Sequence, residues 1–309
     1  MNNYKNKIAI TTGDPNGIGA EITIKALKKL DLPEDRVVII SNKRILDFYG
    51  KLDKDYEIIE IPYSSKIEAG RVTAEAGEFS FQSLKTVCEL RPKAIVTAPV
   101  AKSALHLAGH IYNGQTEVLQ KFLSHNGQLA EMLFLARDFR VLLLTRHCAL
   151  KDISLTTDLV IEKVLNLKEF FNKHFVIEKP SFALCGFNPH SGEDGILGQE
   201  EIEILNPAVE ALRKSGVSIT NPLPADTLFV NAGKAFYQNK KCPYDCYIAN
   251  YHDQGLIPIK TVAGDETVNM TIGLDIIRTS PGHGTAFDIA GKNIASEAGM
   301  ISAIKAVMS

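Results

Sequence analysis

The sequence has no large excess of charge, no long apolar run and few cysteines, and each shortage excludes a class of protein. Its 34 basic and 36 acidic residues leave a formal charge of −2, so no basic excess draws the whole molecule to nucleic acid or to an anionic membrane. The longest apolar runs, such as residues 140–145 (RVLLLT), are far shorter than the ~20 residues that a bilayer span needs. No apolar segment precedes the turn at residues 13–15, so we expect no secretory signal peptide.

The 5 cysteines are odd in number and scattered along the chain. This pattern predicts reduced thiols in a cytoplasmic protein rather than a disulfide framework. Cys242 and Cys246 lie close together, but no second cysteine pair or nearby histidine completes a zinc site around them. A structural zinc is therefore not expected at these thiols.

Short β-branched runs alternate with amphipathic helical segments, and the 309 residues are enough for about two domains at ~150 residues each. This alternation predicts an α/β fold with a mainly parallel sheet and helices on both faces. Neighbouring runs at 131–136 and 140–145 suggest an antiparallel pair in the mixed sheet of a second domain. Other strands are expected at 7–12, 37–41, 58–61, 94–97, 182–185, 246–250 and 268–271, and helices at 20–30, 158–175, 200–214 and 296–307, the last packing on the first domain.

The segment GDPNGIG (residues 13–19) lies between a predicted strand and a predicted helix. A phosphate-binding loop is one interpretation, because backbone N–H groups at a helix N-terminus attract anions. The segment lacks the Lys-Ser/Thr of a Walker loop, and its glycines do not fit the dinucleotide fingerprint. A tight turn in which Asp14 or Asn16 caps the helix is the favoured interpretation.

Three of the eight histidines follow strand-like runs and lie among turn residues: His147 after VLLLTR, His190 in GFNPHSG and His252 in NYHDQG. Sites in open α/β sheets form at the carboxyl ends of strands, and neutral imidazole is the commonest ligand for zinc-class metals. His252 also has a carboxylate beside it, in Asp253. A metal site and ordinary surface histidines are both open on this evidence. The histidines expected to be solvated are His106, His110, His125 and His174.

Two segments in the C-terminal part of the sequence contain residue types that are common in anion-binding or nucleotide-binding sites. Lys260, Asn269 and Arg278 are each expected at a strand edge, and such a group could hold a phosphate or a carboxylate. Scattered surface charge is an equal alternative. In residues 283–292 (HGTAFDIAGK), glycines flank a turn with a hydroxyl and a carboxylate. A nucleotide-contacting loop is one interpretation of that segment.

Taken together, these segments resemble the 4-hydroxythreonine-4-phosphate dehydrogenase family of vitamin B6 biosynthesis. They follow the family's order over almost the whole chain. The matching stretches are TTGDPNGIGAE (11–21), TAPVAK (97–102), the pair TE (116–117), TRH (145–147), GFNPHSGEDG (186–195), PADTLF (224–229), YHDQGL (251–256), VNMTIGL (268–274), IRTS (277–280) and HGTA (283–286).

The resemblance implies two α/β/α domains similar to those of isocitrate and isopropylmalate dehydrogenases, with the active site in the interdomain cleft. The first domain would comprise residues 1–110 and 283–309. The second, 111–282, would carry the metal and substrate site and the dimer interface of a cytoplasmic homodimer with shared active sites. The implied reaction is oxidation of the 3-hydroxyl of 4-phosphooxy-L-threonine by NAD⁺ or NADP⁺, followed by loss of CO₂ to give 3-amino-2-oxopropyl phosphate.

The resemblance also implies residue roles. His147, His190 and His252 would bind one divalent metal (zinc, magnesium or cobalt). The substrate contacts would be Thr116, Lys260, Asn269 and Arg278, with Gln115 where the family has a histidine. Asp253 and Lys102 are candidate proton-transfer residues.

The nicotinamide cofactor is expected at the loop that contains His283, Gly284, Thr285 and Asp288. This loop looks like the adenosine-binding loop HGSAPDIAGK of isopropylmalate dehydrogenases. Asp288 falls on that loop's aspartate. An acidic group there accepts hydrogen bonds from the ribose hydroxyls and repels a 2′-phosphate, so NAD⁺ is the expected cofactor.

Other functions remain open at this point. A phosphotransacetylase-like acyltransferase would have a related architecture but no need of three strand-end histidines. A metal-dependent phosphate-ester hydrolase or a non-catalytic phosphometabolite binder would leave the segment at 283–292 without a role. A dehydrogenase of 4-phospho-threonate or 4-phospho-erythronate keeps the chemistry and changes only the substrate, which carries a hydroxyl in place of the amine.

Overall fold

The computed structural model describes residues 3–124 and 130–308. The chain divides into two compact units, here called unit 1 (residues 1–130 and 268–309) and unit 2 (residues 131–267). Residues 111–130 and 268–282, expected in the second domain, belong to unit 1. The reason is packing, because a helix at 115–123 contacts the long helix at 74–90 and a strand at 277–281 pairs with the strand at 94–97.

The sheet of unit 1 has the strand order β3-β2-β1-β4-β11-β10. Its strands are parallel except β10, which is antiparallel to β11. Thr11 at the end of β1 lies opposite Thr97 at the end of β4, so the carboxyl ends of these strands are level. The strands are β1 (Ile8–Thr11), β2 (Val37–Ser41), β3 (Glu57–Glu60), β4 (Ala94–Thr97), β10 (Val268–Ile272) and β11 (Ile277–Pro281).

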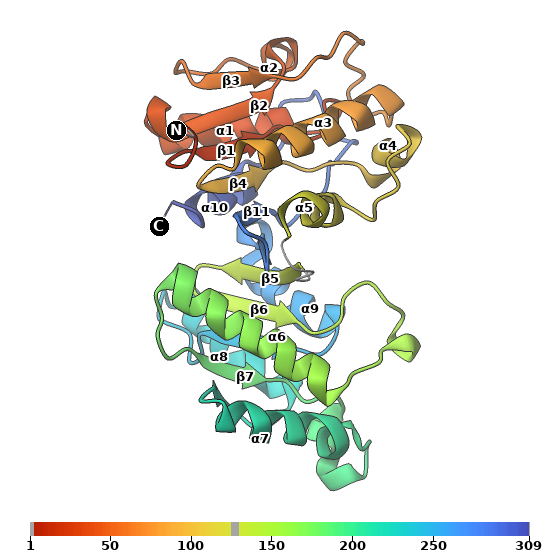
Figure 1. Ribbon diagram of the computed structural model, residues 1–309, viewed down its shortest axis with the longest axis vertical. Helices are drawn as coiled ribbons and strands as arrows, with labels where there is room; N and C mark the ends of the chain where they lie inside the picture. The colour runs from red at the N-terminus through yellow and green to blue at the C-terminus, as the bar shows by residue number, and fades with distance from the viewer. Residues whose placement is uncertain (1–2, 125–129, 309) are drawn as a thin grey trace. The chain divides into compact units, whose positions relative to one another are not determined.

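The helices of unit 1 bury their apolar faces on this sheet, and α3 and α5 cover the face that is nearer the viewer in Figure 1. Phe79 and Leu84 of α3 and Val118 and Leu119 of α5 share one buried cluster with Ile95 of β4. The C-terminal helix α10 packs on α1 and β11, which confirms the expected return of the tail. The helices are α1 (Gly19–Leu30), α2 (Lys43–Tyr49), α3 (Ala74–Leu90), α4 (Lys102–Leu107), α5 (Gln115–Leu123) and α10 (Ala298–Lys305).

The sheet of unit 2 has the order β5-β6-β9-β7-β8. Only the pair β5–β6 is antiparallel, as expected, and the other pairs are parallel. The strands are β5 (Glu131–Ala136), β6 (Phe139–Leu143), β7 (Ser181–Leu184), β8 (Ser218–Ile219) and β9 (Cys246–Ala249), and the helices are α6 (Thr157–Phe170), α7 (Asn206–Lys214), α8 (Ala225–Tyr237) and α9 (His252–Ala263). The predicted α/β class with mixed, mainly parallel strands is therefore confirmed.

Local departures from the predicted elements have identifiable causes. The helix expected over 158–175 ends in a π-helical turn (Phe171–Phe175), and the one expected over 200–214 begins with another (Glu201–Leu205). The strand β11 was not expected, because its sequence IRTSP contains a charged residue at a position that is fully buried. Among the described residues, no helix is long and apolar enough to cross a bilayer.

Candidate functional site

Two of the three predicted metal-binding histidines, His147 and His252, lie side by side in unit 2. His147 follows β6 and His252 opens α9 directly after β9, and these two parallel strands are hydrogen-bonded neighbours. Their carboxyl ends meet at one edge of the sheet, which brings the two rings to 5.6 Å between centroids. His252 is thus the first residue of a helix rather than part of a loop. The rings line a pocket of about 300 Å³ together with Arg146, Cys148, Ala149, Leu150, Ile153, Tyr251 and Asp253.

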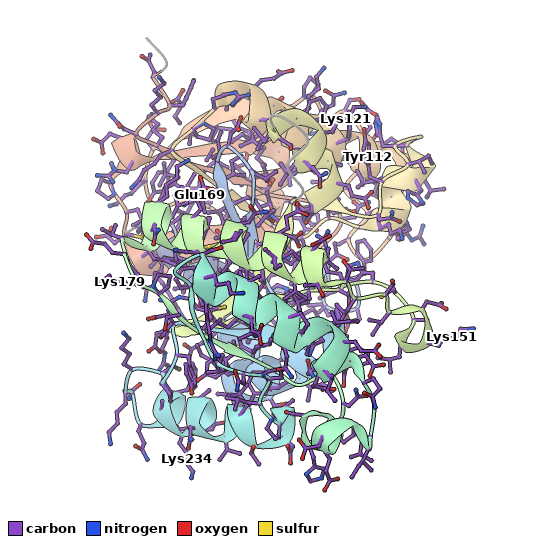
Figure 2. All side chains as sticks on the ribbon, turned by 60° about the horizontal axis from the view of Figure 1, so that its bottom comes forward. Tyr112, Lys121, Lys151, Glu169, Lys179 and Lys234 are labelled. Atoms are coloured by element: carbon purple, nitrogen blue, oxygen red, sulfur yellow. The ribbon has the colours of Figure 1, made fainter. Side chains whose placement is uncertain are left out.

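The geometry of this histidine pair fits two ligands of one cation. Zinc–nitrogen bonds of about 2 Å place the centroids of two coordinating imidazoles roughly 5–6 Å apart. Nδ1 of His252 lies 2.7 Å from Oδ1 of Asp253, a contact that orients the ring through Nδ1, so Nε2 is the nitrogen that would bind a metal. Leu150 of the neighbouring segment Leu150–Asp152 lines this pocket, and Lys151 of the same segment projects outward in Figure 2.

The third predicted ligand, His190, is exposed and does not join the other two. No group of three His, Cys, Asp or Glu side chains able to hold a metal occurs among the described residues. His190 stands in a turn in which His190, Ser191, Glu193 and Asp194 all have φ between 45° and 54°, the left-handed region. This backbone costs about 1–2 kcal/mol for each residue that has a Cβ. Such strain is often retained at functional sites.

Arg278 is the most distinctive residue of unit 1. It is 2% exposed, and its guanidinium donates to Thr97 Oγ1 from Nε (3.0 Å) and Nη2 (2.7 Å) and to Thr271 Oγ1 from Nη1 (3.2 Å). In the described part of the chain no carboxylate lies within ion-pair distance of it, and burial lowers its pKa to about 10. A buried cation without a counter-ion is costly, so this position predicts an anionic ligand.

The strand register explains this arrangement. Arg278 lies opposite Thr271 on β10 and opposite Ile95 on β4, and Thr97 follows two residues later on the same face. Asn269 lies two residues before Thr271, again on this face, and its Oδ1 is buried without a hydrogen-bond partner in the described structure. The threonine hydroxyls that hold Arg278 were missed, because Thr97 looked like the ordinary end of a strand.

Gln115 and Thr116 begin α5 at the same edge of the sheet. Nε2 of Gln115 donates to the carbonyl of Ala98, the residue after Thr97, at 3.1 Å. Its Oε1 is buried without a partner among the described residues. Gln115, Asn269 and Arg278 thus place two acceptors and a cation on adjoining segments of unit 1: the cation suits an anionic group of a ligand, and the two amide oxygens suit its hydroxyl or amine donors.

The two lysines predicted as site residues are both exposed, and they lie in different units. Lys260 was expected at a strand edge but lies in the last turn of α9, in unit 2, and is exposed. Lys102 is the exposed first residue of α4 in unit 1. The structure therefore does not join Lys260 to Asn269 and Arg278 within one unit.

The segment at 13–19 is a tight turn in which four amides are bonded within the protein. The N–H groups from Asp14 to Ile18 are all used internally: Asp14 donates to Pro99 O, Asn16 to Asp14 Oδ1, Gly17 to Asp14 O and Ile18 to Thr285 O. The expected side-chain cap on α1 is wrong, since the N-cap is Ile18. Gly13 is required because its φ of 71° and its closeness to Pro99 leave no room for a side chain.

Asp14 is a buried acid that the sequence pattern did not single out as titratable. It is fully buried, and burial raises its pKa to about 6 against the opposing hydrogen bonds from Asn16 and Ala101. Asn16 ties the turn to the segment at 68–73, since its side chain accepts from Glu68 N and donates to Arg71 O.

The predicted cofactor residues His283, Gly284, Thr285 and Asp288 lie in one loop of unit 1. Thr285 contacts the start of α1 through its carbonyl, and Gly17 packs against its side chain. Asp288 is exposed, while the following residue, Ile289, donates to Ala286 O. The loop is therefore attached at the head of α1, with its carboxylate available to a ligand.

Of the histidines expected to be solvated, His106 is exposed, whereas His174 is partly buried, with its ring 4.6 Å from that of Phe170. His110 stacks on Phe81, with centroids 3.6 Å apart, and its Nε2 lies 2.7 Å from Glu78 Oε2, so this expectation is wrong for His110. His125 lies outside the described residues.

Comparison with known proteins agrees with these features. Residues 7–307 match the family described as pyridoxal phosphate biosynthetic protein PdxA. A 4-hydroxythreonine-4-phosphate dehydrogenase of Sulfurihydrogenibium sp. is 38% identical over 321 residues, which cover 97% of this chain and 96% of that protein. A D-threonate 4-phosphate dehydrogenase of Salmonella typhimurium is 37% identical, covering 97% and 98%.

Solved structures give the same result. The crystal structure of 4-hydroxythreonine-4-phosphate dehydrogenase from Klebsiella pneumoniae has a TM-score of 0.84 and 33% identity, over 98% of this chain and 99% of that one. The resemblance inferred from the motifs is therefore confirmed over nearly the full length. This chain belongs to the PdxA family of pyridoxal phosphate biosynthetic proteins.

Proposed function

We propose that this protein is a metal-dependent dehydrogenase that oxidises 4-phosphooxy-L-threonine in pyridoxine 5′-phosphate biosynthesis. The C3–H hydride passes to NAD⁺ and the 3-hydroxyl proton to a base, which leaves a ketone β to the carboxylate. The bond to the carboxylate then breaks, CO₂ leaves, and the electron pair that remains takes up a proton to give 3-amino-2-oxopropyl phosphate. The observation that carries this proposal is that Arg278 is buried with no carboxylate of the described residues in ion-pair distance, within a chain of this family.

Arg278 and Thr116 would hold an anionic end of the substrate, and the amide oxygens of Asn269 and Gln115 would accept from its hydroxyl and amine groups. The guanidinium is already oriented by two threonine hydroxyls, so little reorganisation is needed when an anion binds. Lys260 would add a second positive charge. Binding energy from these remote groups is then used to orient the reacting carbon.

His147 and His252, with His190, would hold a divalent cation such as zinc, magnesium or cobalt. When bound, that cation would acidify the substrate hydroxyl and stabilise the negative charge left by the departing CO₂. Asp253 is bonded to His252 Nδ1, which favours an orienting role for it over that of a free base. Lys102 remains the other candidate for proton transfer.

The active form would be a cytoplasmic homodimer in which the subunits share metal ligands. The separation of exposed His190 from the His147–His252 pair in one chain supports a site completed by a second copy. All five cysteines are free, as suits a reducing compartment. The loop with His283, Gly284, Thr285 and Asp288 would bind the adenosine part of NAD⁺.

A second candidate substrate is a 4-phosphorylated sugar acid, because relatives named D-threonate 4-phosphate dehydrogenase are as similar as those named for the amino acid. NADH formation at 340 nm should be followed with 4-phosphooxy-L-threonine, 4-phospho-D-threonate and 4-phospho-D-erythronate. The proposal expects the highest kcat/KM for the amino acid and loss of activity with a chelator. A higher kcat/KM for a sugar acid would reassign the substrate, and no NADH from any of them would refute the dehydrogenase assignment.

A further inference from the structure

The left-handed turn that carries His190 is attached to a single buried carboxylate. Glu201 is 4% exposed, and its Oε1 accepts from Asn188 N at 2.8 Å while its Oε2 accepts from Asn188 Nδ2 at 2.9 Å. The same Nδ2 donates to Glu200 Oε2 at 2.6 Å. Asn188 is thus held by its backbone and by its side chain two residues before His190.

The carboxylate of Glu201 also lies against the turn itself. A Cβ added to Gly192 would come within 2.7 Å of Glu201 Oε2, so the turn and the carboxylate are in direct contact. Within the turn, Ser191 N donates to Asn188 O and Leu197 N donates to Gly192 O. The four non-glycine residues in left-handed conformation are therefore enclosed between Asn188 and Glu201, two groups that are joined by two hydrogen bonds.

Glu201 itself belongs to a helical segment that is anchored by a buried side chain. It is the first residue of the π-helical turn Glu201–Leu205, which continues into α7 and buries Leu205. At the other end, Gly186 O accepts from Gln254 Nε2 at 2.7 Å, and Gln254 lies two residues after His252. Asn250 Nδ2 donates to Cys185 O as well. The segment with His190 is consequently fixed to the segment with His252 at one end and to Glu201 at the other.

We propose that Glu201 is a positioning residue that holds Asn188, and through it the strained turn, so that His190 is presented in one orientation for metal binding. Without the carboxylate the turn would relax toward ordinary right-handed or extended backbone and His190 would lose its fixed direction. This inference rests on the proposed role of His190 as a ligand, but the effect on the turn does not.

The carboxylate is needed because both groups that it faces are donors. In Glu201→Gln one acceptor becomes an NH₂ group facing Asn188. Rotating the Asn188 amide to accept from that group would turn its oxygen toward the Glu200 carboxylate, which also requires a donor. The variant therefore keeps the shape of Glu201 and removes one of its two bonds.

Two measurements on the full-length protein test the proposal. Co²⁺ affinity and the Co²⁺ absorption spectrum report on ligand geometry, and amide hydrogen exchange of residues 189–198 reports on the turn. Glu201→Gln should weaken Co²⁺ binding by roughly 10- to 100-fold, the usual effect of removing a group that supports a ligand, and should speed exchange in the turn. Glu203→Gln is the matched control, since Glu203 is exposed in the same helical turn, and it should leave both unchanged.

The outcomes separate this inference from the proposed function. If His190→Ala weakens Co²⁺ binding but Glu201→Gln changes neither binding nor exchange, the positioning role is wrong and the ligand assignment stands. If His190→Ala leaves Co²⁺ binding unchanged, His190 is not a ligand, and hydrogen exchange alone decides whether Glu201 holds the turn. Should Glu201→Gln fail to fold by circular dichroism, Asn188→Ala keeps the backbone bond to Glu201 Oε1 but removes the side-chain bond from Nδ2 to Glu201 Oε2, and it must give the same two effects.

Discussion

The two units present their candidate site residues in opposite ways. In unit 1 the anion-binding side chain, Arg278, is buried and oriented by hydroxyl groups before any ligand arrives. In unit 2 the histidines are partly or largely exposed, and one of them sits on strained backbone. A buried charge must be oriented during folding because its desolvation is costly. Exposed imidazoles remain hydrated, so they need no fixed orientation before a metal or a second chain binds. The unfavourable free energy of unit 1 therefore lies in a desolvated charge, whereas that of unit 2 lies in left-handed backbone. Variants of the two units should differ accordingly in stability and in activity.

The largest effect is expected at Arg278. Arg278→Met should lower kcat/KM by about 1,000-fold, roughly 4 kcal/mol, mainly through KM, because it removes the only described cation held at this position. The same variant should unfold at a temperature equal to or above that of the ligand-free wild type, since a buried unpaired charge is replaced by an apolar group. Kinetics and thermal melting check both parts. A large drop in the melting temperature would mean that Arg278 supports the fold instead of the ligand.

The histidine pair should respond to metal removal and to subunit exchange. Chelation, His147→Ala and His252→Ala should each lower kcat by at least about 100-fold, without the gain in stability expected for Arg278→Met. Mixed dimers of His147→Ala and His190→Ala should regain activity, because the proposed shared site combines the His147–His252 pair of one chain with His190 of the other. If subunit exchange is verified by mass spectrometry and only mixed dimers of His147→Ala and His252→Ala regain activity, these two ligands come from different chains and the proposed partition is wrong.

Asp288 tests whether an exposed loop carboxylate of unit 1 determines cofactor choice. Two anions brought together in a partly desolvated site should cost about 2–4 kcal/mol, so wild type should prefer NAD⁺ over NADP⁺ by roughly 30- to 1,000-fold in kcat/KM. Asp288→Lys should reverse or abolish this preference. Lys292→Ala, which changes an exposed charge four residues away, is the control. Equal use of both cofactors by wild type would show that Asp288 does not contact the ribose.

Asp14 offers a pH test of burial in unit 1. Its pKa rises from 3.8 to about 6 on folding, so the folded state binds the proton more tightly. The stabilisation is fully present below about pH 4 and is lost as pH rises through 6. Relative to Asp14→Asn, wild type should therefore lose roughly 3 kcal/mol of unfolding free energy between pH 4 and pH 7.5. Urea unfolding of wild type and Asp14→Asn at pH 4 and pH 7.5 measures this change. If the difference in unfolding free energy between the two proteins is the same at both pH values, the prediction is wrong.

The smallest effect is expected at Gln115. Gln115→His should lower KM or shift the acid limb of the pH profile by about one unit, with at most a tenfold rise in kcat, ~1.4 kcal/mol. A cationic imidazole near Arg278 adds attraction for phosphate but replaces an amide that already bonds to Ala98. Gln115→Ala is the companion variant. If its kinetics equal those of wild type, Gln115 only fills space beside the substrate.

The sequence by itself determined the class of fold, the antiparallel pair β5–β6, the returning tail and the family. These follow from local periodicity and from motifs whose order along the chain is visible without coordinates. The sequence also showed that His147 and His252 each follow a strand-like run, but it left their approach open, because only the fold shows that β6 and β9 are neighbours whose carboxyl ends lie at one edge.

Only the tertiary structure decided the rest. From the residues alone Arg278 was equally open as an anion-binding residue and as surface charge, and its burial arises because β11 lies between β4 and β10. Lys260 was expected beside it, but a helical position places it in the other unit. The segment at 13–19 was favoured as a tight turn from its sequence, but its hydrogen bonds to Pro99 and Thr285, which are far away in the chain, exist only in the fold. Local pattern specifies which residues form an element, whereas desolvation and hydrogen-bond pairing depend on segments that are distant in the chain and meet only in the fold.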